Sequence, residues 1–264
     1  MNAFTNNSGH LIENRILAAL PPLEYRQLLP YFEPVFLHPR ETLFTAEDSV
    51  QEVYFLKTAV VSLLSVMADG HTSEVGTVGN EGVVGVSAFM GHSPVLNQCL
   101  VVAPGTALKI KASILKEEFK RGGMLQDLLL NFMQALYVQV SQTAACNCFH
   151  TLDQRLARWL LAVRDRSSLS ELELTHEFMA QMLGVRRSGV TLAASSLQQV
   201  GIINYSRGKL RILDQPKLEN VSCECYGVVK KLYHYYPAQA LPQAALEFDS
   251  VSSLLVKERA ATSK

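Results

Sequence analysis

The chain has 264 residues, of which 48% are hydrophobic and 18% are charged, a balance that suits one large or two ordinary globular domains. Lysine plus arginine and aspartate plus glutamate each number 24, so the formal net charge is zero. This composition excludes global disorder, and it leaves nucleic-acid binding to be judged from the local distribution of charge.

We expect no targeting signal at the start of the chain. Its first twenty residues contain no basic segment followed by an apolar run, so we expect no signal peptide. A short apolar helix over residues 11–20 should end at Pro21-Pro22. No stretch approaches about 18 uninterrupted apolar residues, so no membrane partner is expected. Five cysteines without a secretion signal fit a reducing compartment, and we expect a cytoplasmic protein.

Short β-rich runs recur between Val35 and Ile114, punctuated by glycine or proline. They are VYFL (53–56), VVSLLSVM (60–67), SEVGTV (73–78), NQCLVV (97–102) and ALKI (107–110). The ADGHT segment at 68–72 has the composition of a hairpin turn. Short strands at close, regular spacing indicate a sandwich or barrel, so we predict a jelly-roll-like β-roll.

A long helix with few breakers is expected from about Met124 to Cys148. Its apolar residues alternate by four and three, the spacing of a coiled-coil seam. The seam consists of Leu125, Leu129, Phe132 and Leu136, and it continues with the polar residues Gln139 and Thr143. Two interpretations stay open, a dimerisation seam or a helix packed on its own domain, and we favour dimerisation.

The segment from residue 174 to residue 214 has the pattern of two helices joined by a tight turn. Thr175 is a good N-cap for the first helix, and Gly184 can adopt the left-handed conformation that ends it. The second helix should start near Ser188 and end at Gly201, after which two short strands flank a basic tip. This order predicts a winged helix-turn-helix.

The winged segment is locally basic. Between Phe178 and Leu213 there is no aspartate or glutamate, while five residues are arginine or lysine. An α-helix fits the major groove of DNA, and cations at its start and on an adjacent loop can meet phosphates. We expect base contacts from Arg187, Ser188 and Thr191, and phosphate contacts from Arg186, Arg207 and Lys209. Double-stranded DNA is therefore the expected partner.

The order of β-rich domain, long helix and winged helix resembles the Crp/Fnr family of bacterial transcription regulators. The resemblance covers about residues 20–215 and is strongest at LTHEFMAQMLGVRRSGVT and YSRGKLRILD. The EVYFLKTAVVSLL and VGNEGVVGVSAF segments look like the family's cyclic-nucleotide-binding-type β-roll. The resemblance implies a homodimer with two recognition helices on a palindromic operator, and RNA polymerase as a further partner.

The expected fold class is thus α+β. The expected domains are a β-roll sensor domain at 1–120, a long dimerisation helix at 121–150, a winged helix-turn-helix DNA-binding domain at 151–215, and a C-terminal helix with a loosely ordered tail at 216–264.

The recognition helix departs from the family pattern, which often reads Arg-Glu-x-x-x-Arg. Arg187 matches the first arginine, but Ser188 stands at the glutamate position and Leu192 at the second arginine. We therefore expect the operator to differ from the family's usual site.

The effector site departs from the family pattern as well. The phosphate-binding cassette of the family's cyclic-AMP binders resembles Gly-Glu followed later by Arg-Ser or Arg-Thr. Here Asn80-Glu81-Gly82 precedes Pro94-Val95-Leu96-Asn97, and no arginine occurs between Arg40 and Arg121. A cyclic phosphate needs a cation or a dense set of N–H groups, so we expect no binding of cyclic AMP. For another effector, the candidate contacts are Glu81, Gly82, Asn97 and Gln139.

Two cysteine pairs raise the question of a metal, Cys146-x-Cys148-x-His150 and Cys223-x-Cys225. Structural zinc usually takes Cys pairs separated by two to four residues, and Cys-x-Cys on a helix points its thiols about 200° apart. The family's oxygen sensors carry an N-terminal cysteine cluster, whereas here no cysteine precedes Cys99. We expect semi-buried thiols, with neither a metal nor an iron–sulfur cluster.

Catalytic motifs are missing from the sequence. Gly85-Val86-Ser87-Ala88-Phe89 lacks the second glycine of a nucleophile elbow, and there is neither a phosphate-binding loop nor an H-E-x-x-H motif. We expect no enzyme, no catalytic residue and no cofactor. The leading function is a homodimeric, sequence-specific DNA-binding transcription regulator with a sensor of unknown effector. The alternative is a β-roll ligand sensor that acts through a protein partner.

Overall fold

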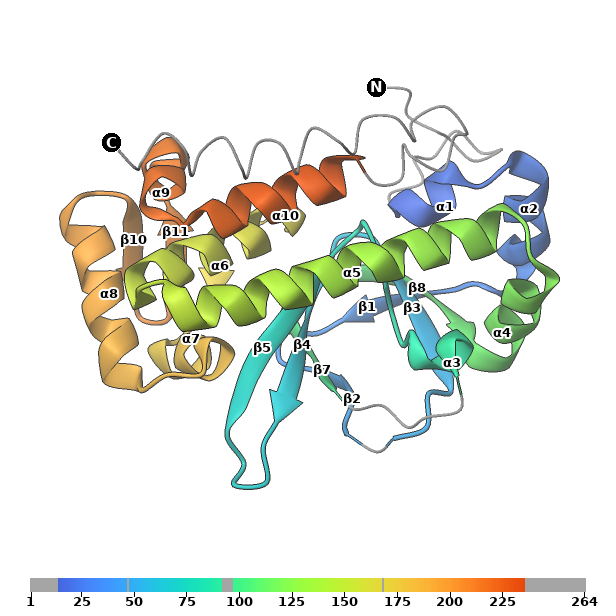
Figure 1. The fold of residues 1–264 in the computed structure, drawn as a ribbon, viewed down its shortest axis with the longest axis horizontal. Coiled ribbons are helices and arrows are strands. Elements are labelled where there is room, and N and C mark those ends of the chain that lie inside the picture. Colours follow the sequence, from blue (N-terminus) through green and yellow to red (C-terminus); the bar gives the residue numbers. More distant parts are fainter. Residues whose placement is uncertain (1–13, 47, 92–96, 168, 236–264) are drawn as a thin grey trace.

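The structure is a computed structural model that describes residues 14–46, 48–91, 97–167 and 169–235 (Figure 1). The predicted tail from residue 237 on, the start of the predicted helix at 11–20 and residues 94–96 of the cassette-like segment lie outside the described residues. None of the described helices is long and apolar enough to cross a membrane.

Two four-stranded antiparallel sheets form the N-terminal part of the molecule. The first sheet has the order β1-β8-β3-β6, with β1 at Glu33–Leu37, β8 at Gly105–Lys111, β3 at Glu52–Leu56 and β6 at Val83–Val84. The second has the order β2-β7-β4-β5, with β2 at Thr42–Phe44, β7 at Gln98–Ala103, β4 at Val60–Val66 and β5 at Thr72–Val78. All five predicted strands and the predicted hairpin turn are present, which confirms the β-roll.

Short helices close this roll: α1 (Arg15–Ala19), α2 (Pro22–Leu28), a 3₁₀ turn (Leu29–Tyr31), α3 (Ser87–Met90) and α4 (Ala112–Arg121). Asn14 fixes the first of them. Its side-chain oxygen accepts hydrogen bonds from the first turn of α1, and its amide donates to the carbonyls of Leu56 and Gly82. This buried asparagine thus joins α1 to both β3 and the turn before β6.

The long helix α5 (Met124–Phe149) extends from α4 at one end of the molecule to the winged unit at the other (Figure 1). The four apolar residues of the predicted seam are at most 6% exposed and lie in the core of the roll. A side chain at Gly82 would lie 2.2 Å from the Phe132 ring, which shows how closely α5 approaches the strands. The favoured interpretation of this seam as a dimer interface is therefore wrong, because its side chains fill the protein's own core.

The opposite face of α5 is exposed and has a heptad spacing of its own. We call it the outer seam, and it consists of Leu130, Gln134, Tyr137, Ser141, Ala144 and Cys148. Leu130 and Tyr137 are 45% and 73% exposed. Exposed apolar side chains that repeat every 3.5 residues are typical of a helix that pairs with a second helix.

The C-terminal half begins with α6 (Leu152–Arg166) and contains a small three-stranded sheet. Its further elements are β9 (Leu172–Glu173), α7 (His176–Leu183), α8 (Arg187–Gln199), β10 (Ile203–Ser206), β11 (Lys209–Ile212), α9 (Gln215–Val221) and α10 (Glu224–Tyr235). The predicted α+β class with a winged helix-turn-helix is thus confirmed.

The winged unit is docked on the second sheet of the roll. One core unites Trp159 and the helix-turn-helix with Val60, Leu64, Leu100, Val102 and Ala103 of the sheet. The indole nitrogen of Trp159 donates to the Glu74 carboxylate on β5 at 2.8 Å. Arg40 lies over the Phe178 ring of α7 at 5.6 Å. The sensor and the winged unit therefore share a core.

Helix α10 leads the chain back to the roll. Val229 and Tyr233 belong to the core that α5 forms with the strands, although they follow the winged unit in sequence. The helix predicted in the C-terminal segment is thus present, and it is an integral part of the packing.

Candidate nucleic-acid interface

The first helix of the winged unit starts and stops at the predicted residues. The Thr175 hydroxyl accepts a hydrogen bond from the amide of Phe178 at 3.1 Å, which is the N-cap of α7. Gly184 has φ 62° and ψ 42°, the left-handed conformation that ends the helix. The apolar face of α7 is buried, and it consists of Phe178, Met179, Met182 and Leu183.

The second helix, α8, presents a stripe of exposed side chains. Val190, Ala194 and Leu197 are at most 3% exposed and anchor the helix in the core. The exposed positions follow the 3.6-residue period on the other side. The stripe consists of Arg187, Ser188, Leu192, Ser195 and Gln199, and Ser196 and Gln198 are exposed beside it. This stripe has the shape and polarity that a recognition helix offers to base edges.

Leu192 is the largest apolar side chain among the exposed residues of α8, and it was not among the predicted contacts. It is 71% exposed. An apolar side chain in this place can contact the methyl group of thymine. Its position opposite Val190 and Ala194 on the helix would have identified it from the sequence.

The wing is a tight hairpin between β10 and β11. Arg207 and Gly208 form its tip with φ of 50° and 80°, the conformation of a type I′ turn. Strand β9 pairs with Lys209 and Leu210 of β11, next to the tip of the hairpin. Arg207 and Lys209 are both exposed, so the predicted phosphate contacts of the wing are accessible.

A chain of contacts connects α8 to the wing. The Thr191 hydroxyl lies 3.0 Å from His176 Nδ1 and also donates to the Arg187 carbonyl. The His176 ring stacks on Tyr205 of β10 at 4.3 Å. Burial and the positive charge of Arg187 hold the pKa of His176 below its usual value. The hydroxyl of Thr191, a predicted base contact, is therefore engaged within the domain.

The charges of the interface come from two elements. Arg186 and Arg187 are exposed at the start of α8, and the wing supplies the others. Acidic residues of the β9 segment lie beside these cations: Glu171 pairs with Lys209 at 3.3 Å and with Arg211 at 3.6 Å, and Glu173 lies across from Lys209 in the sheet. Glu171 precedes the acid-free segment in sequence, and the β9–β11 pairing brings it to the wing.

Replacing Glu171 by glutamine should raise the affinity for any DNA sequence, because it frees the two cations of the wing for phosphates. The gain should be about two- to five-fold, the size of an exposed ion pair, and the slope of log K against log salt should steepen by about 0.9. Fluorescence anisotropy across a salt series measures both quantities. The matched control is Glu117→Gln on α4, an exposed acid remote from the wing. An unchanged slope in Glu171→Gln would contradict the expectation.

The candidate effector residues Glu81 and Gly82 are occupied by the protein itself. Glu81 Oε1 pairs with Arg166 Nε at 2.6 Å, and both side chains are less than 10% exposed. Gly79 also donates its backbone N–H to Glu81 at 3.2 Å. Gly82 lies directly under the Phe132 ring. Neither residue offers a free group to a ligand in this arrangement.

The other two candidates also have protein partners. Gln139 donates to the Thr77 carbonyl at 3.1 Å and accepts from the Tyr233 hydroxyl at 2.6 Å. Arg166 lies over the Tyr233 ring at 5.1 Å, so Gln139 and Glu81 belong to one buried network. Asn97 contacts a different strand, donating to the Leu64 carbonyl at 3.4 Å. Two of the four candidates, Glu81 and Gln139, are thus brought together by Arg166 of α6 and Tyr233 of α10.

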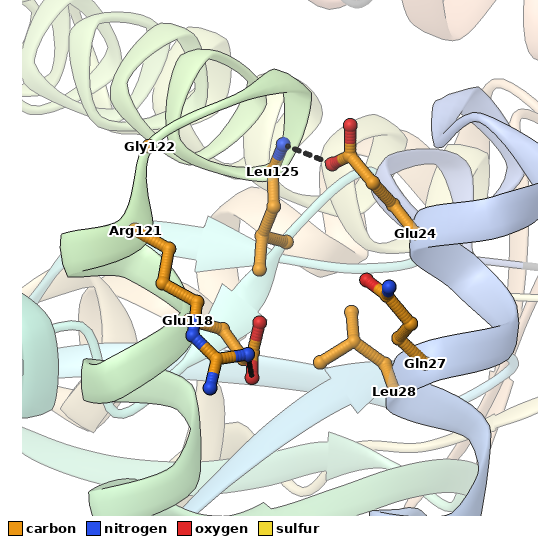
Figure 2. A pocket seen from close by; sticks show the side chains of 7 residues that line it. All are labelled: Glu24, Gln27, Leu28, Glu118, Arg121, Gly122 and Leu125. Carbon is orange, nitrogen blue, oxygen red and sulfur yellow. Dashed lines mark hydrogen bonds and ion pairs between the residues drawn. The ribbon is translucent and has the colours of Figure 1, made fainter.

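A hollow of about 320 Å³ opens between α2, the end of α4 and the start of α5 (Figure 2). Its lining consists of Glu24, Gln27, Leu28, Glu118, Arg121, Gly122 and Leu125. Glu24 accepts the backbone N–H of Leu125 at 3.2 Å, so its carboxylate stabilises the start of α5. None of the four candidate effector residues lines this hollow.

Comparisons with known proteins match both halves of the chain. The cyclic nucleotide-binding domain family matches residues 34–121, and the Crp-like helix-turn-helix domain family matches residues 154–221. No protein in a search of curated proteins matches the chain significantly.

Solved structures give the same architecture. A putative Crp/Fnr-family transcriptional regulator from Eubacterium rectale has a TM-score of 0.63 at 19% identity, over 78% of this chain and 97% of that one. FixK2 from Bradyrhizobium japonicum has a TM-score of 0.61 at 15% identity, over 73% and 98% of the two chains. With its β-roll, long helix and winged unit, this chain belongs to the Crp/Fnr family of DNA-binding transcription regulators.

Proposed function

We propose that the protein regulates transcription as a homodimer that reads a specific palindromic operator. The observation that carries the proposal is the exposed face of α8 beside an exposed basic wing, with no acid between Phe178 and Leu213. Arg187 and Leu192 would face base edges, while Arg186, Arg207 and Lys209 would meet phosphates. The absence of the family's glutamate and second arginine supports a distinct operator sequence.

Selection of bound fragments from genomic DNA, followed by binding assays on the recovered sequences, tests this function. A winged unit that binds DNA should show a steep salt dependence, since each phosphate contact contributes about 0.9 to the slope. The alternative function, a ligand sensor that acts through a protein partner, predicts a flat slope or no binding.

Replacing Arg187 by alanine should relax base discrimination by about 1–3 kcal/mol, because we expect the guanidinium to bridge two acceptors on guanine. Replacing Lys209 by alanine should weaken binding to all sequences similarly and reduce the salt slope by about 0.9. Competition between the selected operator and single-base variants separates the two effects. If Arg187→Ala lost the same affinity for all DNA sequences, Arg187 would contact the DNA backbone and not a base.

The outer seam of α5 supplies the proposed dimer interface. In a parallel two-fold pair of helices, equivalent residues of a heptad seam face each other. Tyr137 and Leu130 would then bury their exposed surface against the partner's same residues. This interface leaves the α8 helices free on both protomers.

Cys148 reports on this interface directly, because it occupies the last position of the outer seam and is exposed. Mild oxidation should join two chains through their Cys148 residues, since seam positions come within the distance that a disulfide needs. Non-reducing electrophoresis detects the cross-linked dimer, and Cys148→Ser should abolish it while Cys99→Ser does not. A dimer in solution that fails to cross-link would place the interface elsewhere.

The roll would communicate with DNA through its contacts with the winged unit. The Glu81–Arg166 pair and the Glu74–Trp159 hydrogen bond both join a strand-side carboxylate to α6. An effector that weakens them would change the spacing of the two recognition helices, which is a two-state element in the allosteric sense. We expect cyclic AMP not to act here, because Glu81 is already paired with Arg166.

A further inference from the structure

Three cysteines and one histidine come together where the end of α5 meets the start of α10. Cys146 and His150 lie one helical turn apart at the end of α5, and Cys223 and Cys225 flank the first residue of α10. Their four ligand atoms all lie within 4.8 Å of one another. The Sγ atoms of Cys146 and Cys223 are 3.5 Å apart, as are Cys225 Sγ and His150 Nδ1.

The spacing of these cysteines in the sequence argued against a metal because it paired Cys146 with Cys148. Cys148 is exposed and points away, as expected for a position two residues from Cys146 on a helix. His150 is four residues from Cys146 and therefore shares its face. Cys223 precedes α10, so its thiol is free of helical spacing and can approach that of Cys225.

We propose that Cys146, His150, Cys223 and Cys225 bind one zinc ion in a closed structural site. A tetrahedral zinc ion with bonds of about 2.3 Å to sulfur and about 2.1 Å to nitrogen separates its ligand atoms by about 3.6–3.8 Å. The two measured separations of 3.5 Å are close to these values. An iron–sulfur cluster places several atoms between its ligands and needs wider spacing than this.

The surroundings orient the ligands as they do in known zinc sites. His150 Nε2 lies 3.2 Å from a Glu224 carboxylate oxygen, which leaves Nδ1 for the metal. Gln142 donates its side-chain N–H to Cys225 Sγ at 3.1 Å. Both contacts come from residues next to the ligands on the same two helices.

A buried arginine balances the charge of the site. Three thiolates and a zinc ion carry one net negative charge. Arg158 is only 7% exposed, and its Nε has no hydrogen-bond partner among the described residues. Its charge acts on Cys146. A buried guanidinium is costly without a nearby anion, and the zinc–thiolate group would provide one.

Zinc would link the end of α5 to the start of α10, two segments that lie far apart in sequence. Four protein ligands leave no open coordination position, so the site would be structural and not catalytic. Its metal-binding energy would add to the folding of the C-terminal part, where α10 returns to the roll.

Metal analysis of the full-length protein, purified without a metal-binding tag, tests the proposal. We expect about one zinc ion per chain in the wild type and in Cys148→Ser, the matched control from the same helix. Cys223→Ser and Cys225→Ser should lose the metal. His150→Cys should retain it, because four cysteines also form a zinc site, whereas His150→Ala should not.

Two further measurements test the zinc site even if a cysteine variant fails to fold. Cobalt added to the chelated wild type should give the spectrum of tetrahedral cobalt with thiolate ligands. Glu224→Gln, an exposed change, should weaken zinc affinity about ten-fold or more. Zinc-free wild type whose thiols react freely, an octahedral cobalt spectrum, iron–sulfur absorption, or a disulfide between Cys146 and Cys223 would each overturn the proposal. The DNA-binding assays test the proposed function separately.

Discussion

Replacing Arg166 by methionine is expected to lower the free energy of unfolding by about 3–5 kcal/mol, because it leaves the buried Glu81 carboxylate without its cation. The two side chains are 9% and 4% exposed and their atoms are 2.6 Å apart. The variant also removes the guanidinium from the Tyr233 ring, which loosens α10. Chemical denaturation followed by circular dichroism measures the loss.

The control is Arg121→Met, which breaks the exposed Arg121–Glu118 pair and should cost at most about 1 kcal/mol. In the double variant Glu81→Gln with Arg166→Met, the buried charge is gone and at least about 1 kcal/mol of the loss should return. A double variant that is less stable than Arg166→Met alone would mean that the pair is not the source of the effect.

Replacing Trp159 by alanine is expected to destabilise the protein by about 3–5 kcal/mol, since it removes a large side chain that is only 1% exposed. The Glu74 carboxylate would also lose its indole donor. Because this core unites the winged unit with the second sheet, the chain that joins the roll to the winged unit should become more sensitive to limited proteolysis. The control, Met67→Ala at an exposed hairpin position, should change stability by less than about 0.5 kcal/mol. Equal protease sensitivity of the two variants would contradict the shared core.

Trp159 is the only tryptophan of the chain, so its fluorescence reports on that same junction. Any ligand that separates the roll from the winged unit should change the emission of this one residue.

The sequence predicts the helices and strands well, but it does not predict which face of a helix packs against which part of the protein. The strands, the caps of α7 and the wing follow from periodicity and from single residues such as Thr175 and Gly184. Strands β1, β2, β6 and β9 were not predicted. The last three have only two or three residues, too few for a periodic pattern, and Pro34 interrupts β1. The seam of α5 was misassigned for a physical reason. A helix that packs on its own domain needs the same four-and-three spacing as a coiled coil.

The candidate sites show the same division. The basic surface of α8 and the wing is local in sequence, and its residues were predicted. The contacts that the prediction missed join distant segments. Glu81 and Arg166 are separated by 85 residues, and Cys146 and Cys223 by 77. No spacing rule within one segment can reveal such pairs.

The return of α10 to the roll has a mechanical consequence. Besides the core that it shares with the second sheet, the winged unit is joined to the roll by the chain at two places, where α5 leads into it and where α10 leads out. A body held at one point can swing in any direction, whereas one held at two points turns most readily about the line through them. Once the contacts with the second sheet are released, each recognition helix should therefore move along a single arc across the DNA, in a direction that the two chain connections set.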